Sequence, residues 1–154
     1  MNQLLVQSFR RDMRKIERET GILIAGETAC CSVTVAQCHL LMEMEMRGPS
    51  SLQDIADALS LDKSTLSRTV DSLVQAGLIE RVPDKDNRRK VSLSLTGAGK
   101  EKCTFINTLC NGQYEDIFSF VPEDKLPVVM EGISILATAM VQKRKEGGAP
   151  CCSR

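Results

Sequence analysis

Aromatic residues are scarce in this chain. Its 154 residues include no tryptophan, one tyrosine and four phenylalanines. Proteins that bind sugars or single-stranded nucleic acids stack their ligands on aromatic rings, so a stacking platform is not expected here. The hydrophobic core has to be built from Leu, Ile, Val, Ala and Met side chains, as in packed helical proteins.

A net charge and long apolar runs are also missing. Twenty Lys and Arg residues balance twenty Asp and Glu residues, so any affinity for nucleic acid has to come from a local basic patch. No apolar run approaches the roughly 20 residues that a membrane-spanning helix needs. Residues 1–18 lack the apolar centre of a signal peptide. We therefore expect a cytoplasmic protein that does not contact a membrane.

Cysteine is present in unusual number, because the chain contains seven. An odd number without an export signal argues against a framework of disulfide bonds. Either several cysteines are ordinary small core residues, or some bind a soft metal ion or react with oxidants. His39 is the single histidine, which excludes a histidine-rich zinc or copper site within one chain.

Apolar periodicity predicts two helices in the first third of the chain. The first is expected over residues 3–20, with Gly21 as its end and a loose connection after it. The second is expected to begin after Ser32 or Thr34, either of which can cap a helix, and to continue to Arg47. Gly-Pro follows directly, and proline cannot continue a helix.

Two more helices are expected in the last third. Thr96 can cap a long helix over residues 97–118, and Pro122 can open a last helix that continues to Lys145. The first and last helices carry apolar stripes that a lone small domain cannot cover. These stripes predict a symmetric homodimer that buries them.

Residues 52–95 form the most informative stretch. A short helix over residues 52–59 is followed by a tight turn and a second helix to about Ala76. Residues 78–82 and 91–95 then alternate as strands do, around a charged turn. Short helix, turn, helix and hairpin in this order predict a helix-turn-helix with a wing.

The second of these helices carries short hydroxyls and cations near its amino end. Such side chains can reach base edges and phosphates from the major groove of DNA. The expected contacts are Lys63, Ser64, Thr65, Ser67 and Arg68. The hairpin tip adds Lys85, Arg88 and Arg89, which suit a minor groove or the backbone. A basic run alone is most often a solvated loop, but this one follows a helix-turn-helix at fixed spacing.

The same stretch resembles the MarR family of winged-helix regulators. The resemblance extends over essentially the whole chain and is specific over residues 52–99. The segments that carry it are residues 52–59, 62–68, 70–81, 84–89 and 91–99.

This resemblance implies a homodimer, joined through the first and last helices, that binds a palindromic DNA operator. It implies that Asp86 braces the wing and that Arg88 enters the minor groove. The residues that it places in the major groove are Ser64, Thr65, Ser67 and Arg68.

The predicted fold class is mainly α with a small β-hairpin wing and flanking dimerisation helices. We interpret residues 1–145 as a single domain with its winged core at about 48–100. The dimerisation helices are expected over about 1–20 and 100–145. Residues 146–154 are expected to form a flexible tail that contains cysteines.

Two vicinal cysteine pairs are candidate ligands for a soft ion. Cys30 and Cys31 fall at the predicted start of the second helix, where a thiolate is favoured. Cys151 and Cys152 lie in the tail. Adjacent thiolates suit a thiophilic inducer such as As(III) better than tetrahedral zinc. The other three cysteines, Cys38, Cys103 and Cys110, are expected to be core or interface residues.

These observations favour a homodimeric repressor that a small inducer releases from DNA, with no required cofactor. A regulator that responds to a small aromatic ligand or to thiol oxidation is an alternative. A thiol-dependent redox enzyme is an alternative from another class, but the chain has no nucleotide-binding loop and no CxxC pair. The expected DNA contacts argue against a third alternative, an interaction module that has lost DNA binding. We therefore expect no enzymatic activity.

Overall fold

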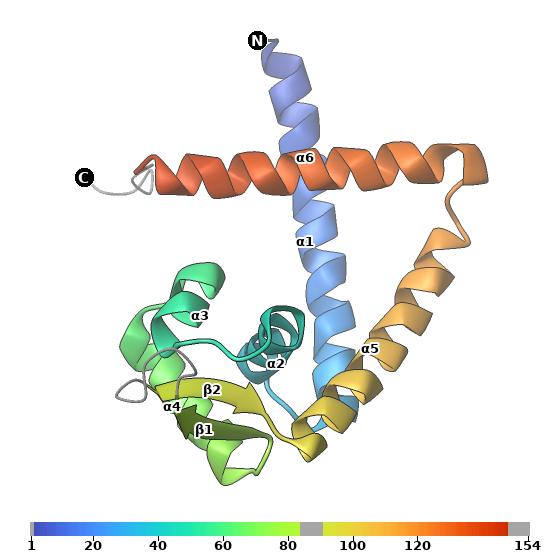
Figure 1. Ribbon diagram of the computed structural model, residues 1–154. Coiled ribbons are helices and arrows are strands. Elements are labelled where there is room, and N and C mark those ends of the chain that lie inside the picture. Colours follow the sequence, from blue (N-terminus) through green and yellow to red (C-terminus); the bar gives the residue numbers. More distant parts are fainter. Residues whose placement is uncertain (1, 84–90, 148–154) are drawn as a thin grey trace. The chain divides into compact units, whose positions relative to one another are not determined.

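The computed structural model describes residues 2–83 and 91–147, without the side chains of residues 27–30 (Figure 1). The chain divides into two compact units, residues 1–110 and residues 111–154. The described part is mainly helical with one two-stranded antiparallel hairpin, which confirms the predicted fold class. Among the described helices, none is long and apolar enough to cross a membrane.

The first helix is longer than the sequence pattern predicts. Helix α1 comprises Gln3–Cys31, and its end is marked by Ser32, which has a positive φ of 54°. The predicted end at Gly21 and the loose connection after it are therefore wrong. A glycine inside a helix costs only about 1 kcal/mol relative to alanine, and the apolar residues that follow Gly21 continue the helix.

Three shorter helices build the core of the first unit. They are α2 (Val35–Arg47), α3 (Leu52–Leu59) and α4 (Lys63–Gln75). Thr34, one of the two predicted candidates, caps α2, and Ser51 caps α3, each through a capping box. The buried aliphatic side chains of these helices belong to one hydrophobic cluster: Leu40, Leu41, Met44, Ile55, Ala56, Leu66, Val70 and Leu73.

The hairpin pairs β1 (Ile79–Pro83) with β2 (Val91–Leu95). Ser50 forms an isolated antiparallel bridge on the other side of β2. Its N–H donates to the Leu93 carbonyl at 3.1 Å, and the Leu93 N–H donates back at 2.8 Å. This bridge ties the start of the helix-turn-helix to the wing strand.

Helix α5 (Gly97–Phe118) begins in the first unit and continues into the second. The second unit also contains a single 3₁₀ turn, η1 (Glu123–Lys125), and helix α6 (Leu126–Lys145). Pro122 precedes the 3₁₀ turn, so the last helix begins later than predicted. Its predicted end at Lys145 is confirmed.

Candidate nucleic-acid interface

Helix α4 is divided into a buried face and an open face. Leu66, Val70 and Leu73 are buried and follow one another at helical spacing, so they fix the rotation of α4 about its axis. Lys63, Ser64, Thr65 and Arg68 are exposed. Ser67, which was grouped with them, is half-buried at the edge of the two faces. The open face therefore combines two hydroxyls with two cations.

The amino end of α4 is fixed by Asp62. The Asp62 carboxylate accepts hydrogen bonds from the Ser64 hydroxyl and from the Thr65 N–H, the latter at 2.8 Å. These bonds, first that of the Ser64 hydroxyl, hold the pKa of Asp62 well below its usual range, because they stabilise the charged carboxylate. Asp62 thus keeps the first turn of α4 in place and orients Ser64.

The cations of α4, Lys63 and Arg68, form no ion pair with another residue that the structure describes. They lie on an exposed helix face, and the positive end of the helix dipole adds to their charge. Exposed cations and hydroxyls near a helix amino end suit contacts to phosphates and base edges.

Hydrogen bonds from α2 and α3 hold α4 in position. The Leu61 N–H donates to the Ala56 carbonyl at 3.0 Å, which closes the tight turn between α3 and α4. The Gln37 side chain on α2 donates to the Ser72 hydroxyl on α4 at 3.0 Å. The open face of α4 therefore belongs to a helix that α2 and α3 hold in position.

The wing is joined to α4 and to α5 at defined points. The Arg81 guanidinium on β1 donates to the Asp71 carboxylate on α4 at 2.5 Å. The Thr96 hydroxyl donates to the Gly77 carbonyl at 2.7 Å and accepts from the Gly99 N–H at 3.0 Å. These bonds connect the turn after α4, the end of β2 and the first turn of α5. The bond from the Gly99 N–H confirms the prediction that Thr96 caps this helix, whereas the other contacts were not predicted from the sequence.

The expected wing contacts lie outside the described residues. They are Lys85, Asp86, Arg88 and Arg89. The strands on either side of them pair in the register that a hairpin needs, with Pro83 opposite Val91. Their roles at the wing tip stay predictions.

The cysteine pair expected at a helix start lies at a helix end. Cys30 and Cys31 are the last two residues of α1, whereas α2 begins at Val35. The argument that a helix amino end favours a thiolate there is therefore wrong, since the carboxyl end carries the negative end of the helix dipole. Cys31 is 2% exposed and belongs to the core cluster.

The remaining cysteines divide between the core and the residues that are not described. Cys103 is completely buried, and Cys38 and Cys110 pack against the same cluster, as a core role predicts. The side chain of Cys30, and Cys151 and Cys152, lie outside the description. Within the described residues, no group of three or more His, Cys, Asp or Glu side chains is placed to hold a metal ion.

Cys103 has the clearest environment of these thiols. Burial, then the nearby negative charge of Glu45 and then Cys38, raise its pKa to about 11. Its sulfur contacts the Leu41 carbonyl on α2 at 3.7 Å. A thiol that stays protonated at neutral pH is a poor nucleophile and a poor metal ligand.

Comparison with known proteins agrees with this geometry. Residues 33–91 match the family model described as the MarR family. The uncharacterized HTH-type transcriptional regulator YfiV of Bacillus subtilis (strain 168) is 25% identical over 158 residues, which cover 95% of this chain and 94% of that protein. The multiple antibiotic resistance protein MarR of Escherichia coli (strain K12) is 31% identical over 71 residues, which cover 46% and 49% of the two chains.

The fold has solved counterparts. The structure of a MarR family protein from Bacillus stearothermophilus superimposes with a TM-score of 0.83 at 18% identity. The match covers 92% of this chain and 99% of that one. The similarity in fold thus extends well beyond the residues that the family model matches.

Proposed function

We propose that this chain, which belongs to the MarR family of transcriptional regulators over residues 33–91, is a sequence-specific repressor that binds operator DNA as a homodimer. The observation that carries the proposal is the open face of α4. It presents Lys63, Ser64, Thr65 and Arg68 from a helix whose other face is fixed in the core. Helices of this kind enter the major groove in helix-turn-helix proteins.

The variant Arg68→Ala tests this interface. Loss of one base or phosphate contact costs about 1–3 kcal/mol, so its affinity for a specific site should fall by roughly 5- to 150-fold. Arg14→Ala removes the same charge from an exposed position on α1 and serves as the control. Fluorescence anisotropy at matched salt measures both. Equal affinities of the two variants for DNA would contradict a recognition role for α4.

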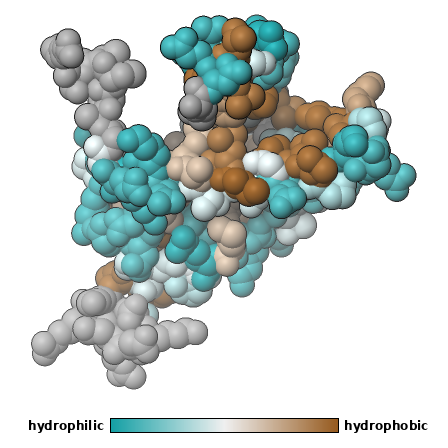
Figure 2. All heavy atoms as spheres, turned by 90° about the horizontal axis from the view of Figure 1, so that it is seen from above, coloured by the Kyte–Doolittle hydropathy of each residue, from teal (hydrophilic) through white to brown (hydrophobic). Residues whose placement is uncertain are grey.

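A homodimer is supported by the apolar side chains that α1 leaves open. Leu4 is 72% exposed and Leu5 is 63% exposed, and further along the helix Phe9, Ile16 and Ile22 are also exposed. Figure 2 shows hydrophobic residues uncovered on the face it displays. Contiguous exposed apolar surface is uncommon on monomers and marks sites of association.

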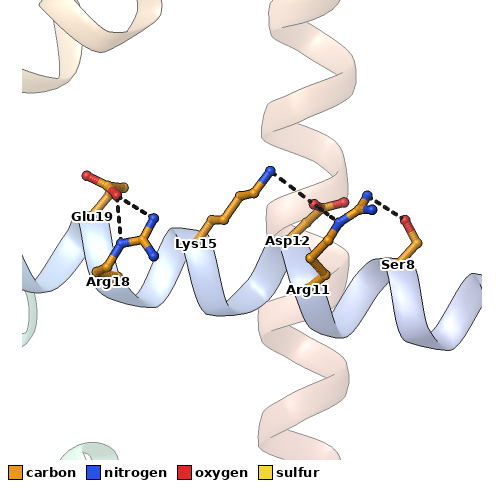
Figure 3. A network of polar contacts seen from close by, with 6 residues as sticks. All are labelled: Ser8, Arg11, Asp12, Lys15, Arg18 and Glu19. Carbon is orange, nitrogen blue, oxygen red and sulfur yellow. Dashed lines mark hydrogen bonds and ion pairs between the residues drawn. The ribbon is translucent and has the colours of Figure 1, made fainter.

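Several charged residues of α1 pair with one another instead. Asp12 lies 3.2 Å from Arg11 and 3.8 Å from Lys15, and Arg18 pairs with Glu19 at 3.0 Å (Figure 3). These local pairs involve five charged side chains of α1 and need no second chain. The apolar side chains are therefore the part of α1 that needs a partner.

Helix α6 of the second unit also leaves apolar side chains exposed. Its exposed apolar residues are Val128, Met130, Ile133, Ile135, Met140 and Val141. A symmetric homodimer that buries α1 and α6 would cover both sets of side chains. Two winged helices would then face half-sites about one turn of DNA apart.

Sedimentation of single-charge variants tests the dimer. Ile16→Glu puts a charge into the apolar stripe and should shift the protein toward monomer at micromolar concentration. Gln7→Glu adds the same charge at an exposed polar position of α1 and should leave the dimer intact. A wild-type protein that sediments as a monomer would contradict the proposal.

A further inference from the structure

A lysine on α5 contacts the carboxyl end of α1, and both residues belong to the first unit. The Lys102 Nζ donates a hydrogen bond to the Cys31 carbonyl at 3.2 Å, and Cys31 is the last residue of α1. The last carbonyls of a helix have no partner within the helix, so they need donors from elsewhere. Lys102 supplies one such donor from 71 positions further along the chain.

The same lysine supplies a positive charge that α1 lacks at this end. The last turn of α1 contains no basic residue, although the carboxyl end of a helix carries the negative end of its dipole. Lys102 brings a cation to this end from another helix. Because its side chain is half-buried, the attraction is screened less by salt than one between fully exposed groups.

Phe105 restricts the position of the lysine side chain. It lies one turn further along α5, and the Lys102 Nζ lies 5.9 Å from the centre of its ring, within reach of a cation–π interaction. A lysine loses much conformational freedom when its ammonium is held in one place, and this second contact offsets part of that cost. Lys102 therefore contacts a ring on its own helix and the end of α1 together.

The start of α5 is itself joined to the winged core. Thr96, directly before α5, donates to the Gly77 carbonyl after α4 and caps α5 through the Gly99 N–H. The first turns of α5 thus contact the end of α4 through Thr96 and the end of α1 through Lys102. Because helical peptide dipoles lie roughly parallel to the helix axis, a donor held at the last carbonyl of α1 constrains the direction of that axis.

We propose that Lys102 is a positioning residue for DNA binding, because it fixes the direction in which α1 leaves the winged core. Its effect on DNA rests on the proposed function, in which α1 joins two chains into a homodimer. In such a dimer the direction of α1 sets the distance between the two α4 helices. Lys102 then determines which half-site spacing the protein prefers, without contacting DNA itself.

Hydrogen exchange of the full chain without DNA tests the contact. Lys102→Met keeps an unbranched side chain but loses the charge and the donor, so amides near the end of α1 should exchange at least about threefold faster. Lys102→Arg should stay close to wild type, because a guanidinium also donates to a carbonyl. Lys100→Met removes an exposed charge from the same helix and is the control. Unchanged exchange in Lys102→Met would overturn the proposal.

A series of DNA sites with different spacing tests the effect on binding. Wild-type protein should bind an inverted repeat of its preferred spacing about tenfold more tightly than the same half-sites moved by one base pair. Lys102→Met should reduce this ratio to about threefold or less, whereas Lys102→Arg and Lys100→Met should retain it. A variant that is merely less stable loses affinity for all spacings alike, so the ratio separates positioning from folding.

Failure of the proposed function and failure of this role give different results. If wild-type protein binds DNA at no spacing, the proposed function fails and the role of Lys102 in binding fails with it. Hydrogen exchange still decides whether Lys102 holds the end of α1. If wild type discriminates between spacings and Lys102→Met keeps the full ratio, the proposed function stands and the positioning role is wrong.

Discussion

Arg81 on β1 donates a hydrogen bond from its guanidinium to the carboxylate of Asp71 on α4. Both side chains are largely exposed, so the pair adds little to stability. Its effect is positional, because it joins the first strand of the wing to the helix that carries the candidate DNA contacts. It also neutralises a carboxylate beside that surface.

Removing Arg81 should therefore affect DNA binding more than folding. Arg81→Met leaves the Asp71 charge unpaired near the phosphates, and we expect DNA affinity to fall by about tenfold, or roughly 1.4 kcal/mol. The free energy of unfolding should change by less than about 0.5 kcal/mol. The double variant Arg81→Met with Asp71→Asn should recover part of the affinity, as anisotropy can measure. No recovery would mean that the freed carboxylate is not the cause.

Gly99 is required by a close approach of two backbone segments. A Cβ at this position would lie 2.1 Å from the Leu78 carbonyl oxygen. Gly99→Ala should therefore destabilise the protein by about 2 kcal/mol or more, because backbone has to move. Gly97→Ala in the same helix is the matched control, since its Cβ meets nothing within 4 Å. Chemical denaturation of both variants checks this, and equal stabilities would refute the assigned contact.

Stability should fall at alkaline pH because of Cys103. Its pKa is raised from 9.0 to about 11 in the folded protein, so the unfolded chain loses the proton first as pH increases. The contribution is fully present below pH 9 and should shrink by roughly 1 kcal/mol by pH 10. Unfolding of wild type and Cys103→Ala, measured between pH 8 and pH 10, should diverge by this amount. Parallel curves would contradict the raised pKa.

The thiol-sensor hypothesis makes a separate prediction. If Cys30 and Cys31 bind a thiophilic inducer, arsenite should release wild-type protein from DNA and should not release Cys30→Ser with Cys31→Ala. Alanine is the better choice at position 31, because that side chain is buried and a hydroxyl there would be desolvated. Release of the double variant by arsenite would exclude this pair and direct attention to Cys151 and Cys152.

The helix-turn-helix could be predicted because its signals are local. Ser51 and Asp62 are capping residues directly before their helices, and Leu66, Val70 and Leu73 recur at helical spacing. The end of α1 could not be predicted, because the glycine that interrupts its pattern costs too little to stop a helix. That error also misplaced the vicinal cysteines relative to the helix ends.

Contacts between residues far apart in the sequence could not be predicted from local sequence patterns. The bonds from Gln37 to Ser72 and from Asn107 to Glu45 join residues 35 and 62 positions apart. Neither pair has a spacing or motif that indicates it. Ser67 is half-buried because of the way α4 packs against its neighbours. The spacing of apolar residues predicts which face of α4 is buried, but it does not predict the exposure of a residue at the edge of that face.

Selection from a random pool of duplex DNA tests directly whether this protein recognises a specific DNA sequence as a dimer. Wild-type protein should enrich an inverted repeat with half-site centres about 10 base pairs apart. Arg68→Ala should enrich sites in which the preference at one position of each half-site is lost. A wild-type protein that enriches no sequence, or binds all duplexes equally at physiological salt, would contradict sequence-specific recognition.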